Sequence, residues 1–130
     1  MSRRSREWLF RICAAGVALA AAFHAAAMAS PSVARIEYDP GYPAWRHVVF
    51  IAINGSLAWL FLRRPRWLVW PFALLTIEVV GGHGYRAWQL WVTARRVDWI
   101  SIAVVLAAPS ILLLLFLDRR DHDRERPASD

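Results

Sequence analysis

Lysine is absent from this chain, and cysteine is nearly absent. All 16 basic residues are therefore arginines, and the 130 residues carry a net charge of +6. The lone cysteine, Cys13, excludes a disulfide within the chain and any metal site built from several cysteines. The sequence also lacks a nucleophile motif, a zinc-protease pattern and a phosphate-binding glycine loop. An enzyme is therefore not expected.

A basic surface that could hold nucleic acid is also missing. Hydrophobic residues make up 58% of the chain and run together in long blocks, and most arginines lie at the ends of these blocks. A soluble domain of this length would confine its apolar residues to one face of each element. Blocks of this length are typical of a membrane protein, so the expected surroundings are a lipid bilayer and not a nucleic acid.

The blocks predict an all-α fold, an integral membrane bundle of four transmembrane helices in a single domain, residues 1–117. The predicted spans are residues 8–29, 44–62, 67–91 and 99–117.

Local signals set the expected ends of these helices. Asp98 is a predicted N-cap for the last span. Pro109 interrupts that span, and Ser110 or a neighbouring helix is expected to compensate for the missing amide. Residues 118–130 are charged with mixed sign and are predicted to form a disordered cytoplasmic tail.

The arginines also predict an orientation. The leader contributes four, the turn at residues 63–66 three, and the tail four, all on one side of a four-span arrangement, whereas five lie on the other side. The positive-inside rule then places both termini in the cytoplasm, in what we expect to be a bacterial cytoplasmic membrane. Tryptophans near the span ends are typical of an aromatic belt: Trp8, Trp45, Trp67, Trp88, Trp91 and Trp99.

The first segment has two interpretations. A basic leader, an apolar stretch and the small residues around Met28 fit a cleaved secretory signal peptide covering residues 1–29. The same residues are long enough for a retained transmembrane helix, which the four-span prediction adopts. Cleavage would remove His24 from the mature chain.

Three histidines are expected in the outer half of the membrane on three different helices: His24, His47 and His83. Imidazoles from separate helices of a bundle can bind a transition metal or provide two axial ligands to a haem. Arg46 and Arg86 lie nearby and could pair with an anion at the rim. In the alternative, each histidine is an interfacial residue bonded to a backbone carbonyl or to a loop carboxylate, Glu37 or Asp39.

A carboxylate, Glu78, is expected near the middle of the third span, at the depth of Asn54 in the second. Such an acid is costly in lipid, so it is either a proton-coupling site of a small transporter or a polar contact between helices. Thr76 and Ser56 are further candidate partners. Glu78 and His83 lie about 140° apart on an ideal helix, unless the glycines between them break it.

Three functions follow from these residues. The first is a bundle that binds a ligand or partner through a polar interior open to the outer side, with a histidine-bound haem or metal as one form. The second is a proton-coupled transporter that uses Glu78. The third is an accessory or assembly subunit, acting as a homo-oligomer or within a larger membrane complex.

Overall fold

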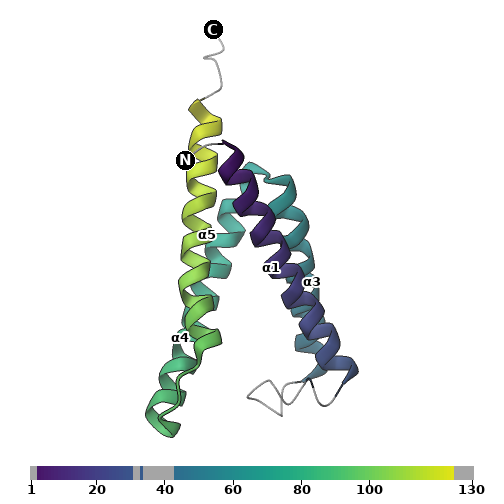
Figure 1. The fold of residues 1–130 in the computed structure, drawn as a ribbon, viewed down its shortest axis with the longest axis vertical. Coiled ribbons are helices and arrows are strands. Elements are labelled where there is room, and N and C mark those ends of the chain that lie inside the picture. Colours follow the sequence, from purple (N-terminus) through teal and green to yellow (C-terminus); the bar gives the residue numbers. More distant parts are fainter. Residues whose placement is uncertain (1–2, 31–32, 34–42, 125–130) are drawn as a thin grey trace. The chain divides into compact units, whose positions relative to one another are not determined.

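The described part of the chain is α-helical. The computed structural model describes residues 3–30, 33 and 43–124, so Glu37 and Asp39 lie outside the described residues. The elements are α1 (Arg3–Ala29), α3 (Ala44–Arg63), the 3-10 turn η1 (Arg66–Leu68), α4 (Val69–Ala94) and α5 (Trp99–Arg124), shown in Figure 1. The all-α prediction is confirmed.

Three of the long helices, α1, α3 and α5, are long and apolar enough to cross a membrane. The fourth, α4, has 26 residues and is long enough, but Glu78, His83 and Arg86 lower its hydropathy. The membrane character of the chain is therefore supported, while the four-span topology and the cytoplasmic location of both termini stay predictions.

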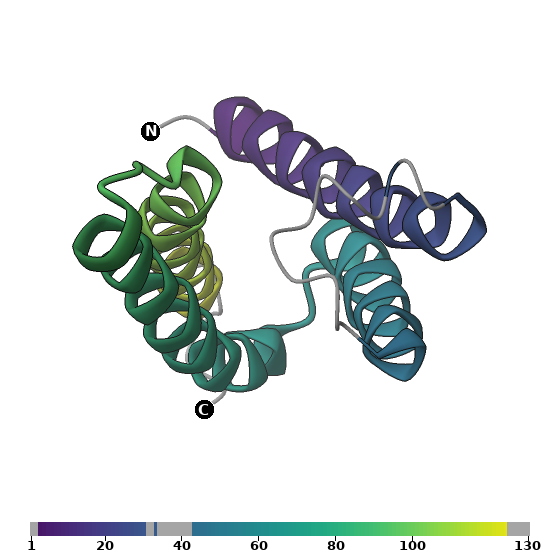
Figure 2. The same cartoon turned by 90° about the horizontal axis from the view of Figure 1, so that it is seen from below.

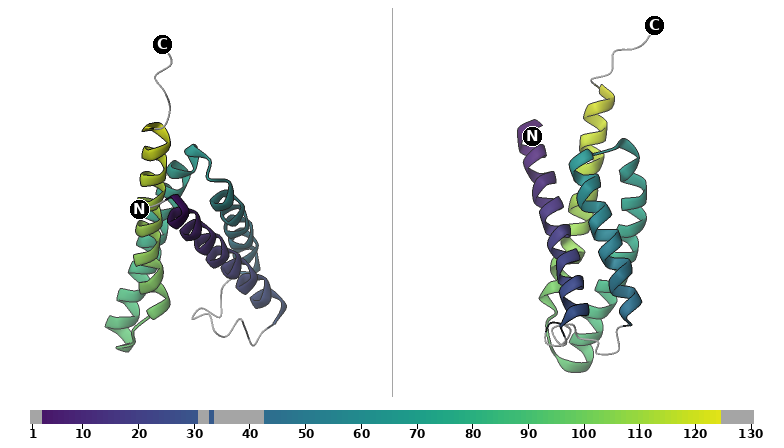
Figure 3. Two further views of the ribbon diagram at one scale, coloured as in Figure 1. Left: turned by 45° about the horizontal axis from the view of Figure 1, so that its top comes forward. Right: turned by 90° about the vertical axis from the view of Figure 1, so that its right-hand side faces the viewer.

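The helices form two separate hairpins. One consists of α1 and α3, and the other of η1, α4 and α5. Within each hairpin the two long helices lie side by side with opposite chain directions, as the views in Figures 2 and 3 agree. The end of α1 therefore lies next to the start of α3, and the end of α4 next to the start of α5. These two meeting points hold the polar contacts described below.

Each hairpin buries a narrow seam and leaves large apolar side chains outside. In the first hairpin Phe10 and Phe61 are 1% and 0% exposed, and their ring centroids lie 6.3 Å apart. Leu19, Ile77 and Trp99 are more than 70% exposed. In water so much exposed apolar surface would favour association, whereas lipid covers such a surface without cost. The outward faces are therefore those of membrane helices.

Two helices end on arginines in the left-handed conformation. Arg64 (φ 51°, ψ 49°) follows α3, and Arg95 (φ 52°, ψ 34°) follows α4. The Arg64 amide donates to the Leu60 carbonyl at 2.7 Å, and the Arg95 amide to the Trp91 carbonyl at 3.1 Å. These bonds satisfy carbonyls that a helix end would otherwise leave without partners.

The last helix differs from expectation in two ways. α5 continues through Pro109, and the Ser110 hydroxyl donates to the Leu106 carbonyl at 2.8 Å. Pro109 has no amide hydrogen, so the carbonyl that loses its helical partner is that of Val105. The Ser110 hydroxyl bonds the next carbonyl, that of Leu106, and therefore does not replace the missing bond.

The predicted disordered tail is the second difference, because α5 extends to Arg124 and its residues 118–124 are helical. The extension makes contacts within its hairpin. The Arg119 guanidinium lies 5.4 Å from the ring centroid of Trp70 and 3.9 Å from the Asp123 carboxylate. Arg66, at the start of η1, lies 3.5 Å from Asp123 as well. The sequence-based prediction ended the last helix at residue 117 because hydropathy falls there. Hydropathy does not take account of ion pairs or of contacts between arginine and aromatic rings.

Candidate histidine sites

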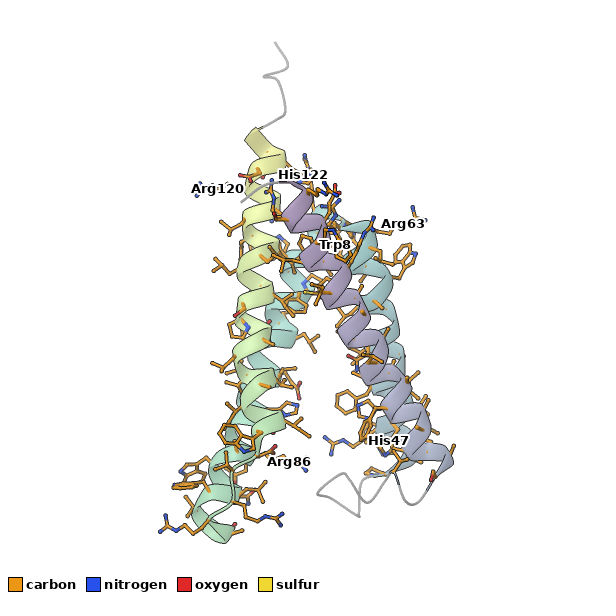
Figure 4. The ribbon with its side chains drawn as sticks, in the orientation of Figure 1. Trp8, His47, Arg63, Arg86, Arg120 and His122 are labelled. Atoms are coloured by element: carbon orange, nitrogen blue, oxygen red, sulfur yellow. The ribbon has the colours of Figure 1, made fainter. Side chains whose placement is uncertain are left out.

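The first hairpin brings two of the predicted histidines together. His24 lies near the end of α1 and His47 in the first turn of α3, and their Nδ1 atoms are 3.1 Å apart. His47 is only 5% exposed. The ring of His24 stacks on Phe50, with centroids 5.0 Å apart and planes within 16°. Figure 4 places His47 at the opposite end of α3 from Arg63.

The distance between these nitrogens constrains the protons on the pair. One Nδ1 must donate and the other must accept, so two neutral rings adopt opposite tautomers. Two imidazolium rings would place a donor against a donor. The contact therefore holds one proton between the rings.

The second hairpin places His83 in a different network. Its Nδ1 lies 3.0 Å from the Ser101 hydroxyl, and that hydroxyl donates to Asp98 Oδ2 at 2.8 Å. Because the single hydroxyl proton goes to the carboxylate, His83 Nδ1 is the donor to Ser101. The neutral ring then carries its lone pair on Nε2, in the orientation that histidine ligands adopt when the other ring nitrogen donates a hydrogen bond.

Asp98 is the anchor of this network. The Ser101 amide donates to Asp98 Oδ1 at 3.1 Å, which confirms the predicted N-cap of α5. Arg86, one helical turn after His83, lies 3.6 Å from Asp98 Oδ2. Burial alone would raise the pKa of Asp98, but the hydrogen bonds from Ser101 and the charge of Arg86, joined by that of His83 when its ring is protonated, hold the pKa below its usual value.

These residue types resemble those of a nucleophilic triad, but their order differs. In a triad histidine takes the serine proton and the acid holds the histidine. Here Ser101 lies between the other two and gives its proton to Asp98. The arrangement therefore orients His83 and does not activate Ser101. The sequence prediction did not include Ser101, although its spacing of three residues after the cap Asp98 was a visible signal.

Each hairpin contains part of the predicted set of site residues. His24 and His47 are in contact in one hairpin, and His83 and Arg86 share Asp98 and Ser101 in the other. Among the described residues, no group of three or more histidine, cysteine, aspartate or glutamate side chains is placed to hold a metal. Convergence of all three histidines stays a prediction, as does a rim role for Arg46, which precedes His47 on α3.

The polar pair predicted at the middle of the membrane also stays untested. Asn54 donates to the Phe50 carbonyl of its own helix at 2.8 Å, and Thr76 donates to the Phe72 carbonyl at 2.8 Å. Glu78 is exposed on α4. The glycines after it stay helical, and none of the described glycines has positive φ. Glu78 and His83 therefore point to different sides of one unbroken helix.

The chain matches no protein-family model, no curated protein sequence and no solved structure. Among the described residues, the contact between His24 and His47 is the feature with the most specific chemistry.

Proposed function

We propose that this chain is a small integral protein of a bacterial cytoplasmic membrane that binds a divalent transition-metal ion through His24 and His47. The proposal includes four spans and both termini in the cytoplasm, so that the two imidazoles lie near the outer surface. The observation that carries it is the distance of 3.1 Å between the two Nδ1 atoms.

This distance fits two neighbouring ligands of one ion. Zinc and similar ions bind imidazole nitrogen at about 2.0–2.1 Å, so two ligands at angles between square and tetrahedral lie about 2.9–3.4 Å apart. The observed separation falls within that range. Loss of the shared proton and modest rotation of the rings would convert the hydrogen-bonded pair into two ligands.

The same distance disfavours a haem held by this pair. Two axial ligands lie on opposite sides of the iron, about 4 Å apart at metal–nitrogen bonds of about 2.0–2.1 Å, with a flat macrocycle between them. The contact of the two nitrogens leaves no room for that ring. A single ion of the kind that imidazole prefers, such as Zn²⁺, Cu²⁺ or Ni²⁺, is the better fit.

The burial of His47 and the stacking of His24 support a role in binding. Both rings are held by neighbours, His47 among buried groups and His24 against Phe50. A ligand that is already held in place loses little rotational freedom when the ion binds. Water, or ligands from other groups, would complete the coordination of the ion.

The membrane part of the proposal rests on three apolar helices and on the pairing of α4 with α5. Since α4 lies alongside α5, a bilayer crossed by α5 would surround α4 as well. The exposed apolar faces would be covered by lipid, by a second copy of the chain or by a larger membrane complex.

The test is metal binding by the purified full chain in detergent. Titration with Zn²⁺ followed by calorimetry, and with Co²⁺ followed by visible absorption, should show one site per chain. We expect His24→Ala and His47→Ala each to weaken binding at least tenfold, and the double variant to lose less binding free energy than the two single losses together. His122→Ala is the matched control, because His122 bonds Asp118 in the other hairpin. Binding that survives both single substitutions would exclude the proposal.

A further inference from the structure

A second feature of the first hairpin is a pocket at the end remote from the histidines, where α1 begins and α3 ends. Its volume is about 590 Å³ and its lining comprises Glu7, Phe10, Arg11, Phe61, Leu62 and Arg64. Figure 4 labels Trp8 and Arg63 at this end of the hairpin. The lining residues of α1 fall at spacings of three and four, so they share one helix face.

The pocket combines an apolar floor with a charged rim. Phe10 and Phe61 are almost fully buried and pack against each other. The Arg64 guanidinium lies 5.6 Å from the ring centroid of Phe10 and 3.7 Å from the Glu7 carboxylate. Arg11 is exposed at the same rim. Two arginines and one glutamate leave the lining with a single net positive charge.

The backbone holds one of these arginines in place. Arg64 adopts the left-handed conformation, and its amide donates to the Leu60 carbonyl. That bond covers a carbonyl at the helix end, which would otherwise repel an anion. The contacts with Glu7 and Phe10 further restrict the guanidinium. A rim that is fixed before binding loses less side-chain entropy when a ligand arrives.

The position of the pocket along the hairpin indicates the kind of ligand. Arg11 and Arg64 lie at one end of helices that are long and apolar enough to cross a membrane, which is the depth of lipid headgroups. A phosphodiester carries one negative charge and matches the net charge of the lining, and arginine binds phosphate oxygens in a bidentate fashion. The exposed side chain of Leu62, which also lines the pocket, would contact the glycerol and the first part of an acyl chain.

We propose that this pocket binds the headgroup of an anionic glycerophospholipid, with Arg11 and Arg64 on the phosphate and the exposed Leu62 side chain against the glycerol. The site is independent of the histidine pair, which lies at the other end of the same helices. It would fix the depth of the first hairpin in the leaflet that contains the anionic lipid.

The test uses the full chain, purified in detergent and stripped of lipid, and native mass spectrometry to count bound lipids. Phosphatidylglycerol should bind at least fivefold more tightly than phosphatidylcholine with the same chains. Inorganic phosphate should not compete at millimolar concentration, because it has no apolar part to contact Leu62. Equal binding of the two lipids, or competition by phosphate, would overturn the proposal.

Substitutions locate the site. Arg11→Gln should weaken phosphatidylglycerol binding about fivefold, since one basic residue near a membrane surface contributes about that factor. Arg4→Gln is the matched control, because Arg4 is exposed on the same helix but does not line the pocket. Equal losses in both variants would indicate general attraction by charge and would contradict a defined pocket. Unchanged helical circular dichroism shows that the variants fold.

Discussion

Ser101 donates both its amide and its hydroxyl to the carboxylate of Asp98. Asp98 is 7% exposed and Ser101 is 2% exposed, so this cap is made inside the hairpin and not at a frayed end. The hydroxyl also accepts from His83 on α4. A local helix cap thus becomes a contact between two helices.

Removing this hydroxyl should loosen the second hairpin. We expect Ser101→Ala to lower the free energy of unfolding by about 1–2 kcal/mol, because it removes one hydrogen bond to the buried carboxylate of Asp98 and leaves His83 Nδ1 without its acceptor. Ser110→Ala is the control on the same helix, since the Ser110 hydroxyl is exposed and bonds only a carbonyl of its own helix. Unfolding in mixed micelles measures both. Equal effects of the two substitutions would contradict the network.

The carboxylate of Asp98 should make this stability depend on pH. Its pKa is held below the usual value, so its contribution is fully present above the unfolded pKa of about 3.9 and is lost as pH falls through the lower folded pKa. The stability difference between the wild type and Asp98→Asn should therefore be constant above about pH 4 and shrink below it. Unfolding measured from pH 3 to pH 7 checks this.

The matched control for that experiment is Asp123→Asn. The Asp123 side chain is 54% exposed and pairs with arginines at the surface, where ion pairs contribute little to stability. Its effect should be small at every pH. A difference for Asp98→Asn that stays constant down to pH 3 would show that its charge is not what stabilises the cap.

The membrane topology can be read from single cysteines in a Cys13→Ala background. With four spans, Ser5→Cys and Asp121→Cys should react with a membrane-impermeant maleimide from the cytoplasmic side, and Thr93→Cys from the outer side. If α4 does not cross, Thr93→Cys shares the side of Ser5→Cys and Asp121→Cys moves to the other side. None of these changes removes an arginine, so the charge bias that sets orientation is preserved.

The left-handed conformation of Arg95 should make the stability of the protein depend on which residue replaces it. Asparagine tolerates this conformation and a β-branched residue does not. We expect Arg95→Asn to be about 1 kcal/mol more stable than Arg95→Val. Both variants lose the contact of the Arg95 guanidinium with Trp91, so the comparison isolates the backbone. The same two substitutions at Arg96, which does not have positive φ, should differ little.

The amino-acid sequence was sufficient for the helices and for several of their ends. Apolar blocks and arginine-rich turns located α1, α3, α4 and α5 to within a few residues, except at the start of α1 and at the end of α5. The cap at Asp98 followed from its place before an apolar run. These features depend on hydrophobicity and on local hydrogen bonds, which act over a few neighbours in the chain. The helical extension beyond residue 117 was missed because hydropathy falls there, and hydropathy does not reflect the pairs that these residues make with η1 and α4.

The contacts between polar side chains of different helices could be identified only from the tertiary structure. Depth along a helix suggested one group of histidines, but depth alone does not fix which face of a helix meets its neighbour. The pairing of α1 with α3 brings His24 to His47, and the pairing of α4 with α5 gives His83 to Ser101. The sequence alone thus determined an all-α chain with membrane-like helices. Only helix packing, which sets the rotation of each helix against its partner, decided which polar side chains touch.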